Sequence, residues 1–331
     1  MSSAIVNASE RNAKRDVMIM MYQIAQMTCV ICLDDGASFA CECSAFHTRC
    51  FSDFLLRNGR KEECSTCYSR FDREMMAAAS SILFTRTQST FGASHGTTLV
   101  RKLELALALA NSGGGSEAKR LLRDIIVGAS PPWLSAVSKV ELARALRDSG
   151  EARAANDLLE HLVRDLARDT AAWAQHEYIE ACTLLGACCV DLGRFDYSER
   201  LLYWVMKSHL HNPNCSAVKV VQCMRHISEL YEARTDYTLV LETHRAIVQI
   251  IEVEEIDPAR IALANLELAR AEVLVGATAL ASARLCSAIH VLRKRKHDAH
   301  AREALPDARR RLASVIRPRR RLLNKTFPED C

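Results

Sequence analysis

Glycine and proline are scarce in this 331-residue sequence, which contains 12 glycines and 7 prolines, and aromatic residues make up only 6% of it. Alanine and leucine dominate instead, and both residues favour helix. With 49% apolar and 25% charged residues, the overall composition is that of ordinary globular material. We therefore expect a mainly α protein, long enough for two domains or for one small module followed by a longer array.

Several functional classes lack their sequence features here. No run of 18 apolar residues is present, so we expect no transmembrane helix and no membrane partner. A secretory signal, which needs a short basic start followed by an apolar run, is also not recognisable, and this favours the cytoplasm, with the nucleus as the alternative. The sequence contains no recognisable nucleophile–base pair, phosphate-binding glycine loop or open metal site. We therefore expect no catalytic residue that acts by covalent chemistry.

Half of the 14 cysteines lie in one short segment. Its spacing is C-x2-C-x8-C-x-C-x3-H-x2-C-x13-C-x2-C, and its members are Cys29, Cys32, Cys41, Cys43, His47, Cys50, Cys64 and Cys67. Eight sulfur and nitrogen ligands in four close pairs match two tetrahedral zinc ions with no open position, so the metal would hold the fold. A disulfide module is the alternative, but it needs an oxidising compartment. The other seven cysteines are scattered, and we interpret them as small buried hydrophobic residues.

Residues 28–72, which contain these ligands, resemble the RING finger family. Ligand pairs interleave in that family, so the resemblance implies one zinc ion on Cys29, Cys32, His47 and Cys50, and a second on Cys41, Cys43, Cys64 and Cys67. The order of four cysteines, one histidine and three cysteines is that of the RING-variant (RING-CH) branch, whereas the short gaps around Cys43 are those of the RING-H2 branch. A PHD finger shares the ligand order but usually has an aromatic residue where this chain has Glu62.

The resemblance also implies a partner. RING fingers bind a ubiquitin-conjugating enzyme in a shallow apolar groove, and the corresponding residues here are Ile31 in the first zinc loop and Phe54 in a short central helix. The alternative for apolar residues of this helix is that they pack the small core. We favour the core interpretation for Phe51 and Leu55, and the contact interpretation for Ile31 and Phe54.

Two departures from the family pattern bear on activity. The family often has proline after the seventh ligand and a cation just after the eighth, which helps to stabilise the activated ubiquitin conjugate; this chain has Ser65 and Tyr68. Enzyme binding is therefore implied more strongly than efficient transfer. The leading hypothesis is a RING-type ubiquitin ligase, and the alternative is a scaffold whose finger only binds proteins.

The segments on either side of the finger predict helices. Residues 9–27, with Ser9 as the N-cap, form a strongly apolar helix that packs on the finger or the next domain, or else binds a partner. Residues 85–98 are rich in serine, threonine and glycine and predict a linker. The expected organisation is an N-terminal helix (1–27), the finger (28–72), a helix and linker (73–98), a helical array (99–292) and a basic cap and tail (293–331).

From residue 99 the sequence repeats, with turns at Gly113, Gly150, Gly193, Thr235 and Gly276. Eight positions before each turn stands a large aliphatic residue, and seven positions before it a small one. Small or apolar residues follow at helical spacing, which predicts an α-solenoid of about five helix hairpins. The pattern resembles the tetratricopeptide repeat, and the long turn-to-turn spacing resembles its variant in kinesin light chains. An unspecialised helical bundle is the alternative.

Later repeats depart from the pattern at Thr235, at His244, which replaces an aliphatic residue, and at Glu272, four positions before its turn. We interpret His244 as a packing residue. Repeats of this kind bind proteins on their first helices, so the resemblance implies a protein substrate there. Charged residues on those helices include Glu141, Arg144, Arg225, Glu229, Glu232, Glu267 and Arg270. Their mixed signs indicate no ligand of one charge, and solvated surface is the alternative for most of them.

The end of the sequence is basic. Residues 293–325 contain 13 lysines and arginines against 3 acidic residues. Such clusters are typical of nuclear-import signals or nucleic-acid patches, and a solvated capping helix with a loose tail is the alternative. Because no aromatic residues are interleaved, base stacking is not expected and nucleic acid is not a favoured partner.

Overall fold

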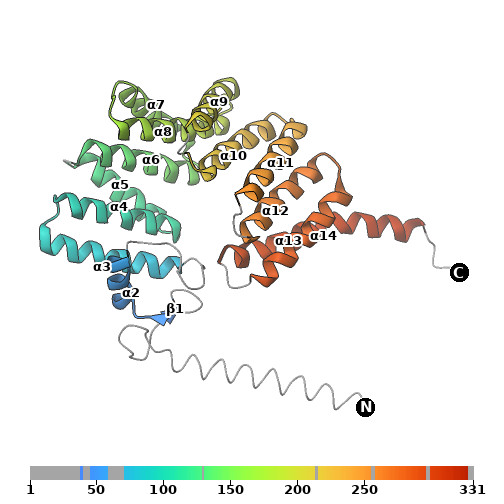
Figure 1. The fold of residues 1–331 in the computed structure, drawn as a ribbon, viewed down its shortest axis with the longest axis horizontal. Helices are drawn as coiled ribbons and strands as arrows, with labels where there is room; N and C mark the ends of the chain where they lie inside the picture. Colours follow the sequence, from blue (N-terminus) through green and yellow to red (C-terminus); the bar gives the residue numbers. More distant parts are fainter. Residues whose placement is uncertain are drawn as a thin grey trace, which may run out of the picture. The chain divides into compact units, whose positions relative to one another are not determined.

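The computed structural model describes residues 38–39, 45–58, 71–128, 130–212, 215–254, 258–295 and 299–326 (Figure 1). Within these ranges the chain is mainly α, as predicted. No helix in the described part is both long and apolar enough to cross a membrane. The chain divides into two compact units, Met1–Gly114 and Gly115–Cys331.

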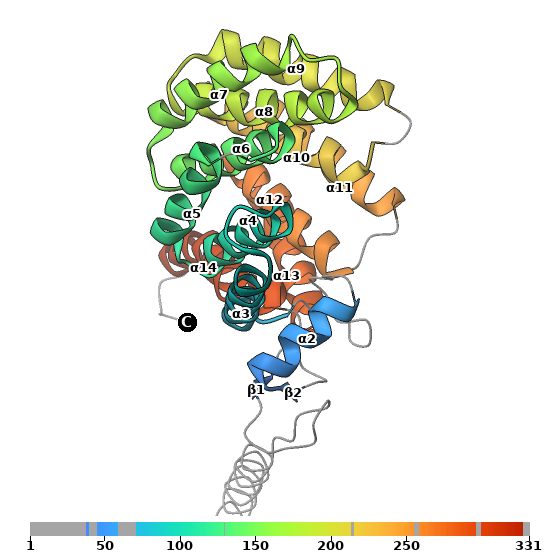
Figure 2. The ribbon, with the colours of Figure 1, turned by 90° about the vertical axis from the view of Figure 1, so that its left-hand side faces the viewer.

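The described part of the first unit begins with two short antiparallel strands, β1 (Ser38–Phe39) and β2 (Ala45–Phe46). Helix α2 (Thr48–Asn58) follows directly and contacts β2 (Figure 2). The ring of Phe51 is fully buried and meets Phe71 edge to face, at 4.9 Å between centroids. Leu55 is buried with it. The core role predicted for Phe51 and Leu55 is confirmed.

Helices α3 (Arg73–Phe91) and α4 (Gly96–Asn111) complete this unit and pack against each other. Asp72 caps α3 by accepting the backbone N–H of Met75 at 2.9 Å. The predicted linker, 85–98, is mostly helical, and only residues 92–95 lie between the two helices. Hydroxyl groups in this segment bond back to carbonyls one turn earlier, as Thr90 does to Arg86 at 2.8 Å, so its polar composition is compatible with helix.

The second unit consists of stacked helix hairpins (Figure 1). Its helices are α5 (Gly115–Val127), α6 (Pro132–Asp148), α7 (Ala152–Leu166), α8 (Ala172–Asp191), α9 (Phe195–His211), α10 (Ala217–Ala233), α11 (Tyr237–Val253), α12 (Pro258–Leu274), α13 (Thr278–Lys294) and α14 (Ala299–Thr326). Each packs on the next along the chain, as the repeat pattern predicts. We call α6, α8, α10, α12 and α14 the first helices.

Every predicted turn residue has a positive φ, which lies between 73° and 91° at the four glycines and is 62° at Thr235. The helix before each turn ends in the same way. In the second turn, for example, the N–H of Gly150 donates to the carbonyl of Arg147 at 2.9 Å, and that of Glu151 donates to Leu146 at 2.8 Å. This pair of bonds is the Schellman motif, which needs a left-handed residue. The turn chemistry therefore explains why glycine recurs at these positions.

The residues around each turn pack as the repeat predicts. Every residue five positions after a turn is buried. Seven positions before each turn stands a small residue, and every one of these that has a side chain is also buried. Gly186 takes this position in the third repeat, and a Cβ added there would lie 2.7 Å from the side chain of Leu202 on the facing helix. The hydroxyl of Ser198, five positions after the turn, donates to the carbonyl of Gly186 at 2.8 Å. The two helices therefore approach each other closely at Gly186.

Two predicted departures are accommodated by polar pairing. His244 is buried and lies 3.0 Å from the hydroxyl of Ser228, so it is a packing residue, as interpreted. Glu272 is fully buried and pairs with Arg284 at 2.9 Å. At the basic end, α14 continues the array: Ala301 and Ala308 are buried against the cluster formed by α12 and α13.

Candidate functional site

Opposite charges run along the first helices of the second unit. Residues three or four apart on a helix share a face, which places Arg225, Glu229 and Glu232 of α10 together. Charged side chains of such groups face side chains of opposite charge on other first helices. We call the resulting set of ion pairs from α6 to α14 the first-helix ladder.

The ladder begins at Arg147 on α6. Its guanidinium donates to Asp191 on α8 at 2.6 Å and to Glu229 on α10 at 2.9 Å, and so joins three first helices. Glu229 also lies 3.1 Å from His226. Although burial alone would lower the pKa of Arg147, the bond to Asp191 and the charge of Glu229 raise it above its ordinary value. This cation stays charged at every physiological pH.

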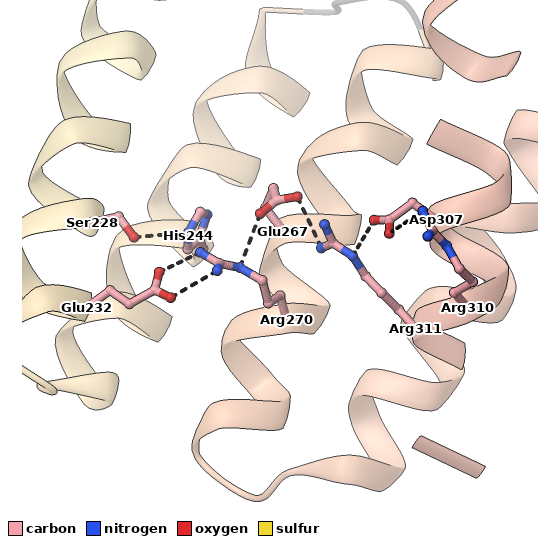
Figure 3. A network of polar contacts seen from close by, with 8 residues as sticks. All are labelled: Ser228, Glu232, His244, Glu267, Arg270, Asp307, Arg310 and Arg311. Atoms are coloured by element: carbon pink, nitrogen blue, oxygen red, sulfur yellow. Dashed lines mark hydrogen bonds and ion pairs between the residues drawn. The ribbon is translucent and has the colours of Figure 1, made fainter. Parts of the chain in front are cut away.

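The ladder continues from α10 to α14 (Figure 3). Arg270 on α12 binds Glu232 on α10 through two parallel bonds of 2.9 and 2.5 Å, and lies 3.4 Å from Glu267 on its own helix. Glu267 in turn accepts a bond of 3.1 Å from Arg311 on α14, and Arg311 donates to Asp307 at 2.6 Å. Two parallel bonds between an arginine and a carboxylate fix orientation as well as charge.

A second group of charges lies nearer the start of α8. Lys219 on α10 pairs with Glu180 at 2.7 Å. Burial, and then the charge of Glu180, raises the pKa of Glu177 to about 6. Burial also raises the pKa of Glu141 on α6, partly offset by Arg144 at 3.3 Å. Three carboxylates thus share one part of this face, and Glu177 titrates within the physiological range.

The charged first-helix residues named from the sequence are therefore mostly paired with one another. Arg225 is exposed. Sequence reasoning missed the partners Arg147, Asp191, Asp307 and Arg311, which are essential to the ladder. Nothing local could reveal them, because the pairing depends on which helices become neighbours. Along the described first helices, the arrangement offers a protein both signs of charge.

Most of the predicted zinc site falls outside the described residues. Only His47 and Cys50 are described; both are half-buried, His47 just before α2 and Cys50 in its first turn. The other six ligands and Ile31 lie outside the described ranges, as does the predicted N-terminal helix. Within those ranges, no group of three metal-binding side chains is found. Phe54 is half-buried, with its ring 6.2 Å from those of Phe51 and Phe71.

The cysteines of the array are mostly inert. Cys182, Cys188, Cys189 and Cys223 are buried, and burial raises the pKa of Cys182, Cys188 and Cys223 to about 12. They are small hydrophobic residues, as interpreted. Cys286 is exposed and does not fit that interpretation.

The comparisons with known proteins bear on the fold. No protein-family model matches the sequence, and none of the curated proteins matches it. Among solved structures, BtubC (BKLC) from P. vanneervenii superimposes with a TM-score of 0.51 at 16% identity, over 66% of this chain and 90% of that chain. The chain carries TPR-like helical repeats. Since the identity is so low, this likeness concerns the fold alone.

Two further solved structures are of a putative kinesin light chain from Podosopora anserina with nearly identical TPR-like repeats, one of them a variant with a single substitution. Each is 21% identical and covers 60% of this chain and 97% of that chain, with TM-scores of 0.47 and 0.45.

Proposed function

We propose that this protein is a RING-type ubiquitin ligase, in which a zinc finger recruits a ubiquitin-conjugating enzyme and the helical array holds a protein substrate. The observation that carries the proposal is the order and spacing of the eight ligands between residues 29 and 67. Paired C-x2-C spacing at both ends of the segment is a specific zinc signal.

The described part of the finger supports this proposal in one respect. His47, just before α2, and Cys50, in its first turn, stand three positions apart. The carbonyl of His47 accepts the N–H of Phe51 at 2.8 Å, so the helical turn already starts at His47 and brings the two residues to one side. Both can therefore bind the same ion. The first zinc ion would then have Cys29, Cys32, His47 and Cys50 as ligands, and the second Cys41, Cys43, Cys64 and Cys67. Each ion would fix loop geometry, because four protein ligands leave no open position.

Ubiquitin transfer by such a protein needs no catalytic side chain of its own. The finger would hold the charged conjugating enzyme and the array would hold the acceptor, so that the rate rises through proximity and orientation. Ile31 and Phe54 would contact the enzyme. Phe54 is only half-buried beside Phe51, which supports a contact at this residue.

The array supports a protein as the second partner. TPR-like repeats expose their first helices along an extended face, and here that face carries the mutually paired charges of the first-helix ladder. The first-helix face therefore suits a folded protein surface that carries both signs of charge better than a uniformly acidic or basic peptide. Exposed Arg225 on α10 would be a contact to such a substrate.

Tyr68 favours a second candidate, a protein-binding scaffold without ligase activity. The family often places a cation at this position, where it helps to restrain the ubiquitin conjugate. Without that cation, the finger would still bind a conjugating enzyme but would stimulate transfer weakly.

Zinc content tests the finger itself. Elemental analysis of the full chain should give two zinc ions, and a chelator should release both while the helical circular dichroism of the array persists. A stoichiometry of zero or one would refute the two-ion ligand set.

Autoubiquitination with a panel of conjugating enzymes separates ligase from scaffold. Ile31→Ala removes no proposed zinc ligand, so the variant should retain its metal while transfer falls roughly tenfold, as expected for the loss of one anchor from a small interface. Tyr68→Arg should raise transfer. If the wild type fails with every enzyme and Tyr68→Arg does not restore activity, the scaffold is the function.

A further inference from the structure

The last hairpin, α12/α13, has polar residues at two interior positions where the earlier repeats are apolar or neutral. Glu272 stands four positions before its turn, where the earlier repeats have leucine, cysteine or tyrosine. Arg284 stands eight positions after the turn, where they have leucine or threonine. The two side chains carry opposite charges and form an ion pair.

Arg284 is the centre of this group. Its Nε donates to Oε1 of Glu272 at 3.0 Å, and its Nη1 donates to Oδ1 of Asn265 at 2.7 Å. Glu272 is fully buried, and its Oε2 has no hydrogen-bond partner among the described residues. A buried ion pair with an unsatisfied oxygen contributes less to stability than an apolar pair of similar size. Stability alone therefore does not explain this arrangement.

A cavity lies directly beside the group. It has a volume of about 500 Å³ and is bounded by the end of α11, the first half of α12, and α13, and ligand sites in proteins are of this size. Arg284 and Asn265 line it together with apolar side chains, among them Ile261, Leu280 and Val291. Asn265 and Glu267 are about 200° apart around α12, so the cavity faces away from the first-helix ladder.

The charges around the cavity define what it can bind. Glu272 neutralises Arg284, whose guanidinium still has two N–H groups beyond its three described bonds. These donors suit a neutral acceptor such as a peptide carbonyl. Glu252 also lines the cavity and is exposed. Together Glu252, Glu272 and Arg284 leave one net negative charge, which disfavours an anionic ligand and favours a cation near Glu252.

We propose that this cavity is a second protein-binding site, which accepts a peptide segment with one large aliphatic side chain next to a lysine or arginine. The aliphatic side chain fills the space between Ile261 and Leu280. A backbone carbonyl of the peptide accepts from Arg284, and the basic side chain pairs with Glu252. This site is separate from the first-helix face and does not depend on the zinc finger.

Selection from a random heptapeptide phage library on the full-length protein tests the proposal, with Leu280→Glu as the counter-target. Leu280 is 47% exposed, so this change should leave the fold intact, and a thermal melt verifies that. The matched control is Val218→Glu, which replaces an exposed valine of α10 outside the cavity. Enriched peptides should share an aliphatic residue beside a basic one.

A synthetic peptide from the selected consensus should bind wild type and the Val218→Glu control equally. Its affinity should fall at least tenfold on Leu280→Glu, because a carboxylate would enter the apolar wall. Glu252→Gln should weaken it about threefold, the effect of one exposed charge pair. The proposal is overturned if no consensus emerges, if the consensus lacks the aliphatic–basic pair, or if Leu280→Glu binds the peptide as well as wild type.

Discussion

The ion pair between Glu272 and Arg284 allows a quantitative test of the packing in the last hairpin. Arg284→Leu installs the residue that three earlier repeats carry at this position, yet we expect it to destabilise the protein. The carboxylate of Glu272 is fully buried and would lose the cation that binds it, whereas Arg284 itself is 26% exposed. Removing one partner of a buried pair typically costs about 3–5 kcal/mol.

We therefore expect Arg284→Leu to lower the free energy of unfolding by about 3 kcal/mol at pH 7. The lower end of that range applies because Arg284 is partly exposed, so water can enter beside Glu272 once the guanidinium is removed.

The double variant Glu272→Leu/Arg284→Leu removes both charges and leaves no buried carboxylate. Its stability should equal or exceed that of wild type, since apolar replacement of a buried pair is neutral or stabilising by about 1–4 kcal/mol. Urea unfolding of the full chain under reducing conditions, followed by circular dichroism, measures all three proteins. Arg120→Leu is the control, because its pairs with Glu117 and Asp124 are exposed and their loss should leave the free energy of unfolding close to that of wild type.

Two results would refute this reasoning. The first is a loss below about 1 kcal/mol for Arg284→Leu at pH 7, which would mean that Glu272 is solvated or paired elsewhere. The second is a double variant that is less stable than Arg284→Leu alone.

The remaining predictions concern the turns, the helix crossing and the first-helix face. Thr235→Gly should raise the free energy of unfolding by about 0.5–1 kcal/mol in the same urea assay, because a left-handed residue with a Cβ costs about 1–2 kcal/mol and the flexibility of glycine offsets only part of that gain. Gly186→Ala should lower the free energy of unfolding by about 1–3 kcal/mol, since the new methyl group would overlap Leu202. The further change Leu202→Ala should relieve the overlap. If Gly186→Ala is as stable as wild type, the close crossing of the two helices is contradicted. Burial raises the pKa of Glu177 to about 6 in the folded protein, so ionisation of this carboxyl group disfavours the folded state. The free energy of unfolding therefore falls as the pH rises from the pKa of Glu177 in the unfolded chain through 6. Glu177→Gln should therefore be more stable than wild type above pH 6, by on the order of 1 kcal/mol, and equal to it below pH 4.5; a difference that is independent of pH would contradict this origin.

Where local chemistry decides the structure, the sequence was sufficient. The left-handed position that ends the helix before each turn requires glycine or a strained substitute, so four glycines and Thr235 mark the five turns. The large–small pair before each turn is likewise read directly from the sequence, because the small residue must lie where two helices cross. The positions of the turns between paired helices follow from these local rules.

Contacts between distant segments could not be predicted in this way. Arg147 joins Asp191 and Glu229, which are 44 and 82 positions further along the chain. The repeat predicts that successive first helices stack, but it does not indicate that one arginine reaches two helices beyond its own. Residues 85–91 look like a linker by composition, yet they belong to α3, which packs along α4. Glu272 departs from the apolar pattern of the sequence, and only the structure shows that Arg284 lies beside it and pairs with it. In each case the deciding energy comes from a partner on another helix, and only the tertiary structure supplies that partner.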